Sequence, residues 1–162
     1  MHLFKTATIW GACMTMACAL LVTTQHPTKA APGVERPAAD GSHRVVIQVT
    51  QNDPAIMNLA LNNAENLVSY YKDRGEKIEI ELVAYGAGLS MVRSDTSPVK
   101  DRLAAISSKM KNVTFTGCGN TLASQSKQEN KTISLVPEAR LVPAGIARIV
   151  ELEEKGWTYV RP

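Results

Sequence analysis

Histidine and cysteine are scarce in this chain of 162 residues, and their positions limit the chemistry that the chain can perform. Only His43 and Cys118 lie beyond residue 30. The sequence therefore has neither the Cys/His spacing of a zinc site nor the Cys-x-x-Cys motif of disulfide exchange. A Ser-His-Asp or Cys-His pair would have to use His43, which we expect to be incidental at the start of a strand.

Long apolar runs are also few. The run from Ile9 to Val22 is shorter than the about 20 residues that a membrane span needs. Lys5 precedes it and Thr28-Lys29-Ala30 follows it, which is typical of a secretory signal peptide over residues 1–30. We expect cleavage after Ala30, a periplasmic or secreted protein, and no stable membrane insertion afterwards. An uncleaved anchor and a lipid-attached Cys18 are the alternatives.

A strong excess of either charge is absent. The whole chain carries +3, but residues 31–162 hold 16 basic and 15 acidic side chains. There is no basic block, so we expect no nucleic-acid partner. Residues 31–42 are rich in Pro, Ala and Gly and predict a flexible linker. Residues 43–162 are enough for one domain with a single core.

Strand and helix patterns alternate along that domain. The sequence predicts strands at 44–50, 78–85, 113–116, 139–142 and 157–160. Helices are predicted to begin at Asp53-Pro54 and Ser97-Pro98 and to occupy 119–126 and 144–155. This order predicts an α/β fold, a three-layer α/β/α single domain around a mainly parallel sheet of about five strands.

One side of the early strands is polar, as shown by Gln48, Glu79, Glu81, Thr114 and Thr116. A parallel sheet covered on both faces normally has strands that are apolar on both sides. Two explanations are open. Either the helices cover this face incompletely near the strand ends, or the polar face takes part in self-association.

Ligands of open α/β sheets bind beyond the carboxyl ends of the strands. In this chain, glycine-rich and polar residues follow the second and third predicted strands. The candidate binding residues are Gly86, Gly88, Gly117, Gly119, Asn120 and Thr121. Arg93 is a further cation that could face an anionic ligand, although a solvated arginine is more common.

Cys118 is the candidate reactive group. It stands at the predicted start of a helix, whose N-terminus lowers a thiol pKa. Gly117 and Gly119 would let another molecule approach the sulfur, and Asn120 and Thr121 could donate hydrogen bonds to it. In the alternative interpretation, Cys118 is a small buried apolar residue and the glycines satisfy a turn with positive φ.

The sequence resembles the DsrE/DsrF-like group of small α/β proteins, in particular its exported, periplasmic members. The resemblance rests on the segments VVIQVT, VAYGAGLSMV, SPVKDRLAAISSKMKNVTFTGCGNTL and ARLVPAGIARIVELEEKGWTYVRP. It covers about residues 43–162. Its most specific parts are the Cys-Gly-Asn-Thr stretch after the third strand and the Gly-Trp-Thr-Tyr-Val-Arg-Pro ending.

This resemblance implies a five-stranded sheet and self-association into dimers, trimers or hexamers. In cytoplasmic relatives a cysteine of this region accepts sulfane sulfur and passes it on as a persulfide, without a cofactor. That role would fall on Cys118. Because this chain is predicted to be exported, the sulfur donor and acceptor proteins of those relatives cannot be carried over.

Three functions follow from these observations. The first is a persulfide carrier acting through Cys118. The second is a non-catalytic binding or assembly module in which Cys118 is structural. The third is a redox enzyme, which would need a thiol from a partner because residues 31–162 hold no second cysteine.

Overall fold

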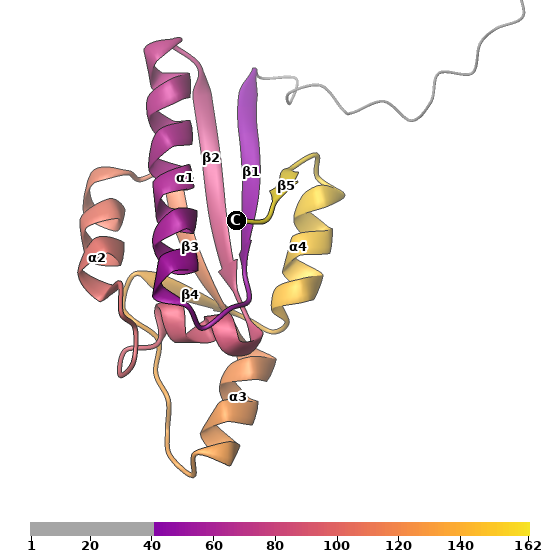
Figure 1. Ribbon diagram of the computed structural model, residues 1–162. Coiled ribbons are helices and arrows are strands. Elements are labelled where there is room, and N and C mark those ends of the chain that lie inside the picture. Colours follow the sequence, from indigo (N-terminus) through magenta and orange to yellow (C-terminus); the bar gives the residue numbers. More distant parts are fainter. Residues whose placement is uncertain (1–40) are drawn as a thin grey trace, which may run out of the picture. The chain divides into compact units, whose positions relative to one another are not determined.

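Five parallel strands form one sheet with the order β4-β3-β2-β1-β5 (Figure 1). The structure is a computed structural model that describes residues 41–162, so the predicted signal peptide and residues 31–40 of the predicted linker lie outside it. The strands are β1 (Ser42–Val49), β2 (Lys77–Ala84), β3 (Val113–Cys118), β4 (Ala139–Val142) and β5 (Thr158–Val160). The predicted α/β fold is confirmed.

The helices are α1 (Pro54–Asp73), the 3-10 helix η1 (Gly86–Val92), α2 (Lys100–Lys109), α3 (Gly119–Gln128) and α4 (Gly145–Glu153). As predicted, Asp53 caps α1: its Oδ1 accepts a hydrogen bond from the Ala55 N–H at 2.7 Å. The helix stops just before Gly75, whose φ of +70° suits glycine. Within residues 41–162, no helix is long and apolar enough to cross a membrane.

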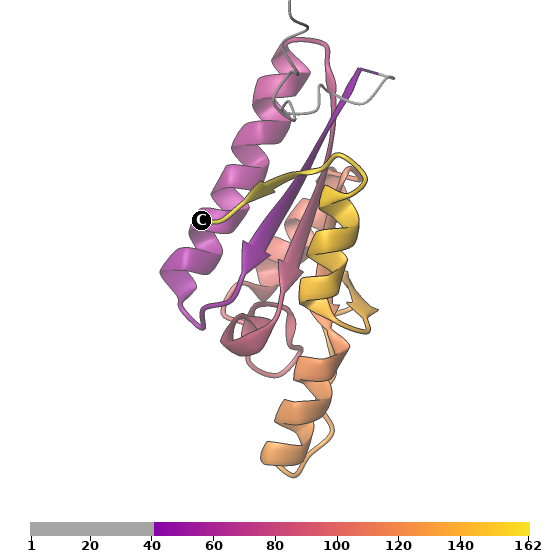
Figure 2. The ribbon, with the colours of Figure 1, turned by 90° about the vertical axis from the view of Figure 1, so that its right-hand side faces the viewer.

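The main core lies on one face of the sheet, under α1, α2 and η1. Alternate strand residues such as Ile47, Leu82 and Phe115 are fully buried there, against Leu61 of α1 and Leu103 of α2. Figure 2 shows α1 and α4 on opposite sides of the sheet. The fold is therefore three-layered, with most of its apolar burial in one of the two interfaces.

The other face is covered by α4, which buries Ile149 and Leu152 against Val46 and Val83. The predicted polar strand residues lie on this face, and two of them are buried. Glu81 and Thr116 are 5% and 1% exposed.

A buried ion pair accounts for these two residues. The carboxylate of Glu81 accepts hydrogen bonds from Nε and Nη2 of Arg148 on α4, at 2.9 and 2.8 Å, and from the Thr116 hydroxyl at 2.8 Å. Part of the polar face is thus an internal contact between the sheet and its covering helix. Neither explanation offered by the sequence included this possibility.

The third helix lies beyond the carboxyl edge of the sheet. β3 passes directly into α3, so the turn expected at Cys118 does not exist. Figures 1 and 2 both show α3 below the strand ends. None of its residues is buried, although Leu122 is partly buried against the main core.

Candidate functional site

Cys118 lies where the N-termini of two helices meet. It is the last residue of β3 and the N-cap of α3, and its sulfur accepts a hydrogen bond from the Thr121 N–H at 3.5 Å. The backbone N–H of Gly145, the first residue of α4, also lowers the pKa of this thiol. Backbone N–H groups at helix N-termini stabilise negative charge.

Gly145 was not among the predicted site residues. A Cβ at this position would lie 3.2 Å from the Cβ of Cys118 and 3.0 Å from that of Tyr85. Glycine therefore allows α4 to approach the cysteine closely. The only signal in the sequence is the Pro143-Ala144-Gly145 stretch between β4 and α4, which does not by itself indicate contact with Cys118.

The surroundings of Cys118 act on its pKa in opposite directions. Burial raises the pKa of the thiol, since a thiolate loses solvation there. The Thr121 side chain and the backbone N–H groups of Thr121 and Gly145 lower it. The net pKa is below the ordinary value for cysteine. At a given pH, the site thus holds a larger fraction of the nucleophilic thiolate than an ordinary cysteine does.

The sulfur is not openly exposed, because Cys118 is only 5% accessible. The flanking glycines do not provide the predicted access. A Cβ on Gly117 would lie 2.8 Å from Cδ1 of Leu135, and one on Gly119 would lie 3.1 Å from the carbonyl oxygen of Val142. The space beside both glycines is filled by the protein itself. Neither residue has a positive φ, so the turn interpretation is also wrong.

Three of the predicted binding residues do come together. The Gly86 N–H donates to Oγ1 of Thr121 at 3.1 Å, and Nε2 of Gln125 donates to the Gly86 carbonyl at 3.1 Å. Gly86 has a φ of +57°, which glycine adopts readily. Gly86, Asn120 and Thr121 line one open hollow, together with Ala87, Ser124, Gln125 and Gln128. Because Oγ1 of Thr121 accepts from Gly86, its own hydrogen is available to the sulfur of Cys118.

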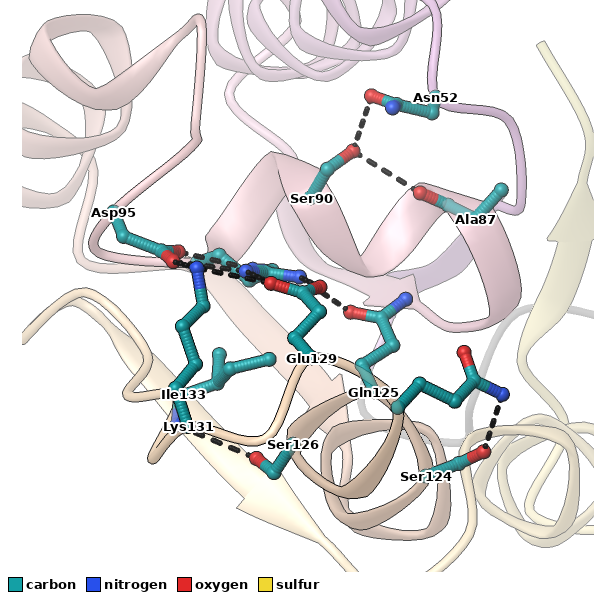
Figure 3. A network of polar contacts seen from close by, with 12 residues as sticks. Asn52, Ala87, Ser90, Asp95, Ser124, Gln125, Ser126, Glu129, Lys131 and Ile133 are labelled. Carbon is teal, nitrogen blue, oxygen red and sulfur yellow. Dashed lines mark hydrogen bonds and ion pairs between the residues drawn. The ribbon is translucent and has the colours of Figure 1, made fainter.

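Gly88 does not belong to this hollow. It is buried where η1 crosses the end of β1, and a Cβ there would lie 2.4 Å from the Val49 carbonyl oxygen. Its role is to allow this close crossing of two backbones. The neighbouring contact is a hydrogen bond from the Ser90 hydroxyl to Oδ1 of Asn52 at 2.6 Å (Figure 3).

His43 lies at the opposite edge of the sheet from Cys118, since it stands at the amino end of β1. Its ring stacks on Tyr71 with 3.9 Å between the centroids, and its Nε2 lies 2.6 Å from Oε2 of Glu76. His43 therefore cannot act as a base for Cys118. Among residues 41–162 there is also no group of three or more side chains suited to holding a metal ion.

Comparison with known proteins bears on the fold. No family model matches the chain, and no curated protein matches it. A solved structure of a protein of unknown function from Methanobacterium thermoautotrophicum is similar, with 28% sequence identity and a TM-score of 0.63. The match covers 74% of this chain and 99% of that one. This chain therefore shares the α/β fold of the archaeal protein.

Proposed function

We propose that this protein handles sulfur in the manner of the DsrE type, accepting sulfane sulfur on Cys118 and holding it as a persulfide. The observation that supports this most is the convergence of N–H groups from α3 and α4 on one sulfur atom. An arrangement that stabilises a thiolate also stabilises a persulfide anion, because both carry negative charge on sulfur. The absence of a second cysteine in residues 31–162 favours a carrier over a disulfide enzyme.

The proposed reaction is an exchange between sulfur atoms. The Cys118 thiolate attacks the outer sulfur of a donor persulfide or of thiosulfate. A new S–S bond forms at Sγ, the S–S bond of the donor breaks, and the donor leaves with the electron pair as a thiolate or as sulfite. Attack by an acceptor thiolate on the outer sulfur then regenerates the Cys118 thiolate. The exchange balances without an added oxidant.

The test is mass spectrometry of the protein after incubation with thiosulfate or polysulfide. We expect wild-type protein to gain the mass of one sulfur atom on the peptide that contains Cys118, and a reductant to remove it. Cys118→Ser should gain none. A small model thiol in the same solution is the control for the donor. If that thiol is modified while Cys118 is not, the proposal is wrong.

The second candidate is an assembly or binding module with a structural cysteine, which the burial of Cys118 favours. In that case the thiol caps α3 and takes no part in chemistry. Thiol labelling separates the two functions. A carrier should react with iodoacetamide in the native state, whereas a purely structural thiol should react only after denaturation.

The compartment and the partners belong to the same proposal. We place the protein in the periplasm or outside the cell, as a homo-oligomer that exchanges sulfur with a donor or acceptor protein. The exposed apolar side chains of Leu141, Ile146 and Val150 support self-association.

A further inference from the structure

Polar contacts, more than apolar burial, hold α3 against the rest of the domain. Leu122, near the start of α3, is the one side chain of this helix that packs against the main core, and it is partly buried. The Asn120 N–H donates to the Pro143 carbonyl at 3.0 Å, and Gly86 contacts both Thr121 and Gln125. Because α3 has no fully buried side chain, its direction depends on these contacts and on those at its far end.

One buried arginine provides the contacts at the far end. Arg93, which follows η1, has a side chain that is 6% exposed. Its Nη1 donates to Oε1 of Gln125 at 3.0 Å and to Oε1 of Glu129 at 2.6 Å, and its Nη2 donates to Oε2 of Glu129 at 2.9 Å. Asp95 accepts two more hydrogen bonds from it, at 2.9 and 2.8 Å. Figure 3 shows Asp95, Gln125 and Glu129 converging.

This network stays ionised over the physiological pH range. Hydrogen bonds from Arg93 and Lys131 hold the pKa of Glu129 at about 2, and Arg93 lowers the pKa of Asp95 as well. Nζ of Lys131 lies 2.9 Å from Glu129 and 3.0 Å from Asp95. Arg93 is thus neither the solvated arginine nor the ligand-facing cation that the sequence suggested.

The segment after α3 is anchored separately. The Ser94 N–H donates to the Ser134 carbonyl at 2.8 Å, and the Val136 N–H donates to the Val92 carbonyl at 2.9 Å. These bonds fix residues 134–136 but do not touch α3. The contacts of Arg93 with Gln125 and Glu129 therefore tie the end of the helix to the residue that follows η1, in addition to the hydrogen bond from Gln125 to the Gly86 carbonyl.

We infer that Arg93 is a positioning residue for Cys118: by clamping the far end of α3, it holds the first turn of this helix against the sulfur. The inference rests on the proposed function, since it assigns a residue that controls the reactivity of the same thiol. Thr121 in that first turn lowers the pKa of Cys118 through its side chain and its backbone N–H. A helix that swings outward would weaken these contacts and expose the thiol.

The experiment measures the rate of iodoacetamide alkylation of Cys118 as a function of pH in the intact protein. The midpoint of the profile gives the thiol pKa, and the plateau at high pH reports access to the sulfur. We expect Arg93→Gln to move the midpoint upward by about one pH unit. At a pH below the midpoints of both proteins, the variant would then hold about tenfold less thiolate than the wild type. The plateau rate should rise. The midpoint of Arg93→Lys should lie between those of the wild type and Arg93→Gln.

Arg102→Gln is the matched control. Arg102 also bridges two elements, since it donates to Oδ1 of Asn58 at 2.7 Å and of Asn62 at 2.9 Å and pairs with Glu65. It joins α2 to α1, on a different part of the domain. Its loss should leave the alkylation midpoint unchanged. An unchanged midpoint in Arg93→Gln as well would overturn the inference.

Glu129→Gln keeps the test decisive if Arg93→Gln does not fold. It removes one charged partner while leaving Arg93 bonded to Asp95, so we expect a smaller shift in the same direction. A midpoint equal to that of the wild type would also overturn the inference. Alkylation requires no sulfur transfer. Failure of the persulfide assay with wild-type protein would therefore contradict the proposed function while leaving the role of Arg93 to be decided by the midpoints.

Discussion

At the scale of single residues, Gly88 and Gly117 near the carboxyl edge of the sheet serve close packing rather than ligand access. They differ in what surrounds them. Gly88 faces the backbone of β1, with 2.4 Å between a built Cβ and the Val49 carbonyl oxygen. Gly117 faces the methyl groups at the end of the Leu135 side chain, 2.8 Å away. A backbone cannot move aside as a flexible side chain can.

This difference predicts unequal costs for two similar substitutions. Gly88→Ala should lower the free energy of unfolding by about 3 kcal/mol or more, because a backbone must shift. Gly117→Ala should change it by less than about 1 kcal/mol, since Leu135 can adjust and the loss of chain entropy on folding is smaller for alanine. Urea unfolding of both variants measures the difference. Equal losses at the two positions would contradict this account of the packing.

The surroundings of Cys118 could be predicted from the sequence only in part. The start of a helix at residue 119 and the donor Thr121 follow from local patterns, and the structure places both as expected, whereas the Asn120 N–H donates to the Pro143 carbonyl. The contribution of Gly145 depends on how α4 crosses the sheet. Contacts between residues far apart in the chain leave no mark on local composition, so this one could not be predicted.

At the scale of elements, α4 covers its face of the sheet with few buried apolar side chains. It meets its face of the sheet through Ile149 and Leu152 and through the pair between Arg148 and Glu81. The carboxylate of Glu81 is almost completely buried, whereas the Arg148 side chain is 28% exposed. A buried carboxylate that loses its partner is costly, while an apolar pair of similar size is often tolerated.

Arg148→Met should therefore lower the free energy of unfolding by about 2 to 3 kcal/mol, less than for a fully buried pair because Arg148 is partly exposed. Glu81→Met combined with Arg148→Met should recover most of this loss. Arg102→Met is the control, because the exposed pair of Arg102 with Glu65 should contribute less than about 1 kcal/mol. Chemical denaturation of the four proteins gives the values. A double variant no more stable than Arg148→Met would contradict this interpretation.

Some element boundaries were predictable because they rest on short-range signals, although the helix predicted to begin at Ser97-Pro98 begins at Lys100. β4 has the predicted bounds, and α1 begins at the predicted Asp53-Pro54 pair. The predicted strand 113–116 in fact continues to Cys118, since β4 pairs with its last residues. The pair between Glu81 and Arg148 could not be predicted, because it joins residues 67 positions apart.

At the scale of the whole molecule, the parallel sheet and its layering follow from the alternation of strands and helices, and the archaeal structure shares this fold. Self-association depends instead on which side chains stay exposed at the surface. α4 turns Ile149 and Leu152 inward, yet Ile146 and Val150 on its other side are 56% and 48% exposed. Residues four apart on a helix lie on the same face, so these two form one apolar stripe.

If the protein is a homo-oligomer, this stripe is the surface of α4 best suited to bury apolar area between copies. We expect sedimentation of wild-type protein to show a dimer, trimer or hexamer, and Val150→Asp to shift it toward the monomer, because an unpaired carboxylate in an apolar interface is costly. Leu59→Asp is the matched control: Leu59 is 42% exposed on α1, across the sheet from α4. Its variant should keep the wild-type sedimentation. A monomeric wild type would remove self-association from the proposal, and an equal effect of both variants would show that the stripe on α4 is not the interface.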